Sequence, residues 1–135
     1  MPKNTGLTAN GRLQPPPASP NCVTSMSDPK DAKHYIEPIR YGELSREEAR
    51  ARLLEAVKGM PLAHLIKEQD KYLYFEFRTK MLKFTDDVEF LLPEDEPLIH
   101  MRSASRIGYS DWGTNRKRLE AVRAAFAAQK QPTKA

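Results

Sequence analysis

The sequence predicts an α+β domain in which two helices pack on one face of an antiparallel sheet. A serine-initiated capping box precedes apolar residues at helical spacing, and a second amphipathic stretch lies near the carboxyl end. Between them, four strand candidates follow one another with short connections. Because consecutive strands joined by short turns pair as an antiparallel meander, the predicted order is strand, helix, four strands, helix.

The amino-terminal quarter of the chain is rich in proline, with six of the eleven prolines before residue 30. Proline fixes φ and lacks a backbone donor, so we expect neither helix nor strand pairing in this stretch. We therefore assign residues 1–33 to a proline-rich arm that lies over the domain or is partly disordered. Residues 34–128 form the single α+β domain, and residues 129–135 form a flexible tail.

The first predicted strand and helix follow the arm. Tyr35, Ile36 and Ile39 form a short apolar patch interrupted by Pro38, a pattern that suits a short edge strand. Ser45 and Glu48 form the capping box, and the apolar spacing then continues as far as Gly59. This pattern predicts a helix with one apolar and one charged face.

The four remaining strands are predicted from alternation of apolar and polar residues. Leu73, Phe75 and Phe77 alternate with polar residues, so they share one face of their strand. In the last strand, Arg102 lies on one face and Ser103 on the other. The predicted ranges are 62–68, 72–78, 84–92 and 98–105.

The second helix closes the predicted domain, with Ser110 or Thr114 as its cap. Its apolar stripe contains Trp112, Leu119, Val122 and Phe126. The resulting β-α-β4-α order is that of TATA-binding-protein-like and helix-grip-like folds, a likeness of topology that implies no function.

Composition excludes several classes of protein. The 135 residues include 22 Lys and Arg against 18 Asp and Glu, a net charge of +4. No run approaches the ~18 apolar residues of a membrane span, and no signal-peptide pattern is present at the start. We therefore expect a cytoplasmic protein as the chain stands, or an exported or membrane-associated one if a leader was removed. The one cysteine, Cys22, excludes an intramolecular disulfide and a multi-cysteine metal site.

One polar constellation stands at the junction between the last strand and the last helix. Arginine, serine and asparagine side chains near a helix N-terminus are able to hold an anion. In a ligand-binding interpretation, these side chains fix a polar head group between aromatic walls. The candidate ligand-binding residues are Arg102, Ser103, Ser105, Arg106, Tyr109, Trp112, Asn115 and Arg116.

A structural interpretation of the same motif is favoured, because ion pairs between neighbouring strands are common. Arg102 and Arg106 would pair with Asp86 and Asp87, each carboxylate accepting two hydrogen bonds from a guanidinium. The four residues would then form a structural clasp. The two interpretations are compatible with each other.

Three sequence blocks resemble those of a known family. They are Ser19-Pro-Asn-Cys-Val-Thr-Ser25, Asp86-Asp-Val-Glu-Phe90 and the polar stretch 102–118. On these blocks the chain resembles the domain of unknown function 1499 family from about Gly11 to Phe126. The resemblance implies no assigned reaction, and many members of the family look secreted or membrane-attached.

Cys22 is the candidate reactive thiol, and it would need a base such as His34, His64 or His100. A cysteine in a proline-rich arm is more commonly a packing residue, so we favour that role. The three histidines show no metal-ligand spacing, so we expect no metal site. No cofactor is indicated.

The charges are distributed unevenly, with seven basic and two acidic residues between Arg102 and Lys130. Nucleic-acid or anion binding through the basic last helix is a weak alternative, because no recognition motif accompanies the charge. Our first hypothesis is a non-catalytic binding or accessory domain for a small apolar or anionic ligand or a protein segment. The enzyme alternative uses Asp86 or Asp87 as a base, with Arg102 and Arg106 stabilising negative charge.

Overall fold

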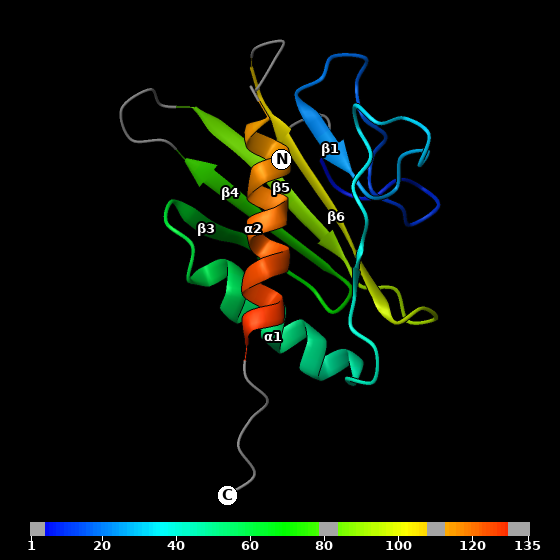
Figure 1. Ribbon diagram of the computed structural model, residues 1–135, viewed down its shortest axis with the longest axis vertical. Helices are drawn as coiled ribbons and strands as arrows, with labels where there is room; N and C mark the ends of the chain where they lie inside the picture. Colours follow the sequence, from blue (N-terminus) through cyan, green and yellow to red (C-terminus); the bar gives the residue numbers. More distant parts are fainter. Residues whose placement is uncertain (1–4, 79–83, 108–112, 130–135) are drawn as a thin grey trace, which may run out of the picture.

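The computed structural model describes residues 5–78, 84–107 and 113–129. Its described part contains six strands and two helices, and two helices lie on one side of the sheet (Figure 1). The α+β class predicted from sequence is therefore confirmed. The elements are β1 (Cys22–Thr24), β2 (Ile39–Arg40), α1 (Arg46–Lys58), β3 (Ala63–Glu68), β4 (Tyr72–Arg78), β5 (Thr85–Leu91), β6 (Leu98–Ser105) and α2 (Thr114–Ala128).

The strands pair in the order β1-β6-β5-β4-β3, and every pair is antiparallel. Strands β3 to β6 form the predicted meander, and their bounds agree with the predicted ranges within one residue. β2 pairs with the beginning of β6 and is only two residues long. Its shortness is consistent with Pro38, which precedes it and has no N–H to donate to a ladder.

β1 corrects the expectation that the arm forms no strand pairing. Cys22, Val23 and Thr24 pair with Ala104, Ser103 and Arg102 of β6. The three residues of β1 contain no proline and are all buried, so they complete the edge of the sheet. The proline-rich composition of the surrounding arm obscured this short strand.

Helix α1 begins and ends where the sequence predicts. The Ser45 hydroxyl accepts a hydrogen bond from the Glu48 N–H, and the Ser45 N–H donates one to the Glu48 carboxylate. Both donor–acceptor distances are 3.0 Å. Gly59 is the C-cap residue. Helix α2 differs, because its N-cap is Gly113 at a φ of 81°, a left-handed conformation that glycine adopts without strain. Thr114 is therefore the first helical residue rather than the cap.

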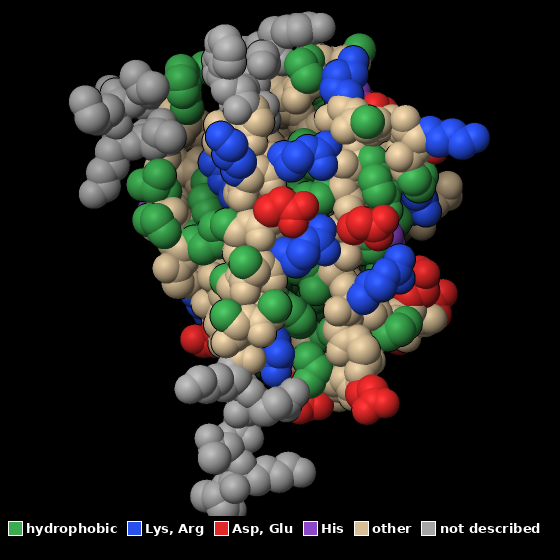
Figure 2. Space-filling model, in the orientation of Figure 1, with side chains coloured by type: hydrophobic (Ala, Val, Ile, Leu, Met, Phe, Trp, Pro, Cys, Tyr) green, Lys and Arg blue, Asp and Glu red, His purple; other side chains and the backbone are tan. Residues whose placement is uncertain are grey.

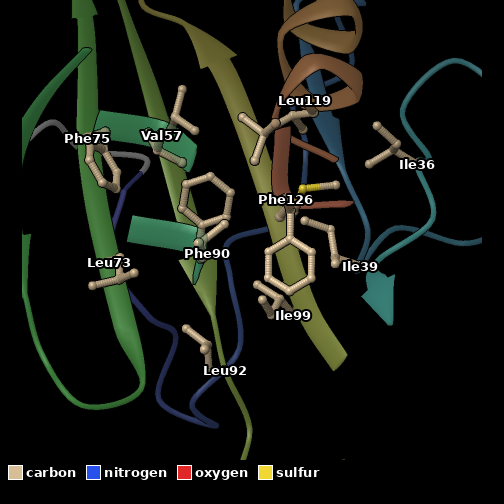
Figure 3. Packing of buried hydrophobic residues seen from close by; sticks show 14 of the residues in the cluster. Ile36, Ile39, Val57, Leu73, Phe75, Phe90, Leu92, Ile99, Leu119 and Phe126 are labelled. Carbon is tan, nitrogen blue, oxygen red and sulfur yellow. The ribbon is translucent and has the colours of Figure 1, made fainter. Parts of the chain in front are cut away.

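The main core fills the space between the helices and the inner face of the sheet, meaning the face that the helices cover. Figure 3 shows aliphatic and aromatic side chains from both layers packed together. The rings of Phe75 and Phe90 meet edge to face, with 6.0 Å between their centroids. The helices contribute the predicted buried residues Leu53, Val57, Leu119, Val122 and Phe126. Trp112 and Ser110, which the sequence also placed in the last helix, lie outside the described residues.

The opposite side of the sheet, the outer face, is covered by the amino-terminal segment, defined here as residues 5–20. Figure 3 shows this segment as a dark blue ribbon behind the strands, on the far side from the main core. Leu13 packs there in a second apolar cluster with Tyr72, Tyr74 and Leu91. The sheet is thus buried on both faces over part of its area.

Candidate functional site

Strand alternation gathers polar side chains on the outer face of β4, β5 and β6. Tyr74 lies opposite Glu89, and Glu89 lies opposite Arg102, so tyrosine, carboxylate and guanidinium form one row across three strands. Each tyrosine hydroxyl bonds diagonally to a carboxylate of β5, Tyr72 to Glu89 and Tyr74 to Asp87, and Arg106 binds Asp87 in turn. The outer face therefore carries two clusters of the type tyrosine, carboxylate and arginine.

The first cluster consists of Tyr72, Glu89 and Arg102, and all three side chains are buried. The Tyr72 hydroxyl donates a short hydrogen bond to the Glu89 carboxylate. Arg102 donates to the other carboxylate oxygen across 3.5 Å. A buried ion pair is stable only where its remaining donors and acceptors find partners.

The amino-terminal segment supplies those partners through its backbone. Arg102 donates from Nε to the carbonyl oxygen of Gln14 at 2.9 Å and from Nη2 to that of Pro15 at 3.3 Å. The Gly6 N–H donates to the Glu89 carboxylate at 2.8 Å. Every guanidinium nitrogen of Arg102 therefore has an acceptor, and the segment is bound by two buried charged groups.

Leu13 is the apolar contact between the segment and the outer face. Its side chain is 2% exposed, whereas Leu7 in the same segment is 38% exposed. The Leu13 side chain packs on Tyr72, Tyr74 and Leu91. Burial of one leucine contributes about 2 kcal/mol, so Leu13 is the main apolar anchor of the segment.

The second cluster consists of Tyr74, Glu76, Asp87 and Arg106 and lies nearer the end of the sheet. Arg106 donates to both oxygens of Asp87, at 2.9 and 3.0 Å, and to Glu76 at 2.7 Å. The Tyr74 hydroxyl donates to Asp87 at 2.5 Å. Both Asp87 oxygens thus accept hydrogen bonds, which is the arrangement of a structural clasp.

Burial and charge shift the acid–base properties of both clusters. Desolvation raises the pKa of Glu89, against the opposing effect of its hydrogen bonds from Tyr72 and Gly6. Desolvation, together with the adjacent carboxylates, also raises the pKa of Tyr72 and Tyr74. Both phenols therefore remain protonated near neutral pH and act as hydrogen-bond donors.

Glu76 shows the opposite shift. Burial acts to raise its pKa, but the hydrogen bonds and charges of Arg78 and Arg106 outweigh burial and lower it. Hydrogen bonding to Asp87 is the largest influence that raises the pKa of Arg106. Glu76 and Arg106 are therefore both charged at neutral pH.

The inner face carries a separate polar network that joins α2 to the sheet. The Asn115 side chain accepts from Ser103 at 2.5 Å and donates to Ser105 at 2.9 Å. It also donates to the backbone carbonyl of Asn21, just before β1, at 3.1 Å. This buried network fixes the start of α2 against β1 and β6.

The predicted ligand-binding group is divided by the sheet. Arg102 and Arg106 lie on the outer face, whereas Ser103, Ser105 and Asn115 contact one another on the inner face. Successive strand residues point to opposite faces, so neighbours in sequence do not converge on one ligand. The six described candidates therefore do not form the single site expected from their sequence proximity.

The remaining candidates of that group lie elsewhere. Arg116 is on the surface of α2 and donates to the carbonyl oxygen of Ala32 at 3.1 Å. Tyr109 and Trp112 fall outside the described residues.

The pairing of arginines with aspartates that the sequence predicts differs from the observed pairing at Arg102 and at Asp86. Arg106 pairs with Asp87, but Arg102 lies beside Glu89 rather than Asp86 or Asp87. Asp86 is on the inner face and pairs with Arg118 of α2 at 2.7 Å. Sequence reasoning missed Arg118 and Glu89, because it did not assign register between strands.

Cys22 is fully buried in β1 opposite Ala104. His34, one of its candidate bases, faces the Asp31 carboxylate and the Ser19 carbonyl oxygen at 2.7 and 2.8 Å. Burial of the thiol favours the packing role over a reactive one.

The helix-bearing surface has mixed charge. Figure 2 shows acidic side chains interspersed among the basic ones on this face. A surface hollow of about 450 Å³ lies there, lined by Tyr35, Glu37, Arg116 and Arg123 among others. Arg123 donates to Glu120 and to the carbonyl oxygens of Glu37 and Pro38. The basic residues of α2 are thus largely engaged within the chain, which weakens the nucleic-acid alternative.

Within residues 5–78, 84–107 and 113–129, no group of three or more histidine, cysteine, aspartate or glutamate side chains is placed to hold a metal ion. Neither helix among those residues is long and apolar enough to cross a membrane.

Comparison with known proteins adds one match. The sequence model of a family described as "Protein of unknown function (DUF1499)" matches residues 12–126. No curated protein matches the chain.

Proposed function

The chain belongs to the DUF1499 family of proteins of unknown function, and we propose that it is a non-catalytic binding domain whose outer sheet face holds an extended polypeptide segment. In this structure, the chain's own amino-terminal segment occupies that face. The observation that carries the proposal is the contact of buried Arg102 and Glu89 with backbone atoms of the segment.

Backbone contacts suit a surface that receives a polypeptide. Arg102 and Glu89 touch a carbonyl oxygen or an N–H, groups that almost every segment offers. Because the donor or the acceptor is charged, these hydrogen bonds are stronger than neutral ones. The outer face therefore binds the backbone of the segment through two charged side chains, and it receives one apolar side chain, Leu13.

The burial of Glu89 and Arg102 also favours a binding role. Two buried charges are costly where hydrophobic residues could pack instead. Here the segment supplies backbone partners to both groups. The buried pair therefore has these protein hydrogen-bond partners only while a segment is bound. A purely structural cover could use apolar contacts alone.

A ligand held in an interior cavity is a weaker interpretation of the domain. The space between helices and sheet is filled by the main core (Figure 3). The hollows between α2 and residues 35–44 are open surface features. Both observations favour an extended surface ligand over an enclosed small molecule.

The test uses the full chain with its own segment displaced. Leu13→Asp places a carboxylate among the aromatic rings beside Glu89, so the segment should leave the face. A fluorescent peptide with the sequence of residues 5–20 is then titrated against the variant, and anisotropy reports binding. Leu7→Asp is the matched control, because Leu7 is exposed.

We expect saturable binding to the Leu13→Asp chain and much weaker binding to the wild-type and Leu7→Asp chains, whose face is occupied. Hydrogen exchange at Gly6 verifies that the segment has been released. A folded, released variant that does not bind the peptide would overturn the proposal.

A further inference from the structure

We infer that the outer face selects partner segments in which a leucine is followed two residues later by consecutive prolines, and that the chain's own segment competes with them. This inference rests on the proposed function and names the class of ligand. Leu13, Gln14, Pro15 and Pro16 provide the pattern in the bound segment.

The leucine position is set by burial. Within residues 5–20, Leu13 is the one described residue that is buried. It packs among Tyr72, Tyr74 and Leu91, next to the buried Glu89. An acidic side chain at this position would be repelled by the carboxylates of the outer face, and a small one would leave a void.

The proline positions are set by the geometry of two carbonyl groups. Arg102 contacts the carbonyl oxygens of Gln14 and Pro15, which are consecutive in the chain. A proline restricts the residue before it to an extended conformation, so Pro15 and Pro16 hold Gln14 and Pro15 extended. Both carbonyls are then oriented for one guanidinium before binding, which lowers the entropy cost of the contact.

Prolines are compatible with this surface for a second reason. Pro15 and Pro16 have no N–H, so they leave no unpaired donor against the face. The Leu13 N–H contacts the Met26 sulfur at 3.4 Å, and Gly6 supplies the N–H that Glu89 accepts. The contacts of residues 13–16 with the outer face therefore use carbonyl acceptors at the two positions after the leucine, and they need no N–H donor from the two prolines.

Other positions of the segment are tolerant. Arg12 is exposed and Gln14 is half-buried, with its backbone rather than its side chain in contact with Arg102. Substitution at these two positions should therefore change affinity little. This separation of fixed and free positions defines a ligand class.

The probes are peptides with the sequence of residues 5–20, which include Gly6, titrated against the full Leu13→Asp chain. We expect Leu13→Ala in the peptide to weaken binding about tenfold or more. Replacing both Pro15 and Pro16 by alanine should weaken it about threefold to tenfold. Peptides carrying Arg12→Ala or Gln14→Ala are the matched controls and should bind within about twofold of the parent.

The outcomes separate the two proposals. Equal binding of a scrambled peptide would leave the proposed function intact and overturn the selectivity. Absence of binding by every peptide would overturn both. Light scattering tests for self-association. A wild-type dimer that is lost in Leu13→Asp would identify a second copy of the chain as the occupant of the outer face, and it would overturn the inference that the partner is a different protein.

Discussion

Arg102 and Ser103 are adjacent in the chain, yet their side chains lie on opposite faces of the sheet. Arg102 contacts Glu89 and the amino-terminal segment, whereas Ser103 donates to Asn115 of α2. The alternation of a β-strand produces this separation. One polar sequence motif therefore serves two structural purposes, segment binding on the outer face and attachment of α2 on the inner face.

The clasp at Asp87 predicts a loss of stability on neutralisation. In Asp87→Asn, the amide cannot accept all the hydrogen bonds that Arg106 and Tyr74 donate, so a buried group loses partners. We expect the free energy of unfolding to fall by about 2 kcal/mol, measured by urea denaturation. Glu94→Gln, which breaks the exposed pair with Lys71, is the control and should leave stability unchanged within error. Unchanged stability in Asp87→Asn would instead favour the enzyme hypothesis, in which Asp87 is a base.

The network at Asn115 predicts a different outcome from that of its neighbour Arg116. Asn115→Ala removes the buried amide that accepts from Ser103 and donates to Ser105 and to the Asn21 carbonyl. We expect destabilisation of about 2–3 kcal/mol by thermal or urea unfolding. Arg116→Ala, which removes a surface hydrogen bond to Ala32, should change stability by about 0.5 kcal/mol or less. Similar effects of the two substitutions would contradict the structural role of Asn115.

Glu76 predicts a pH-dependent contribution to stability. Its pKa is lower in the folded state than the ordinary value of 4.5, so it contributes stability above that pH. This contribution is lost as the pH falls through the folded-state pKa. We expect Glu76→Gln to be less stable than wild type by about 1 kcal/mol at neutral pH, and the difference to close as the pH falls below 4.5 and through the folded-state pKa.

Urea denaturation at several pH values measures this difference. Glu55→Gln, on the exposed face of α1, serves as the control for removal of one surface carboxylate. A stability difference for Glu76→Gln that stays constant between neutral and acidic pH would refute the pH-dependent contribution of Glu76 to stability.

The elements of this fold were predictable because their signals are local. The capping box of α1 involves residues three apart, and the alternation in β4 lies within seven residues. Such patterns require no knowledge of the rest of the chain. β1 was missed because three ordinary residues become a strand only when β6 pairs with them.

The sequence by itself determined the α+β class, the four-strand meander and the alternation that puts Arg102 and Ser103 on different faces. Only the tertiary structure decided which groups meet: Arg102 with Glu89, Arg118 with Asp86, and the amino-terminal segment with the outer face. The physical reason is that strand register and the path of an irregular segment depend on contacts between residues far apart in the chain. A local pattern cannot specify them.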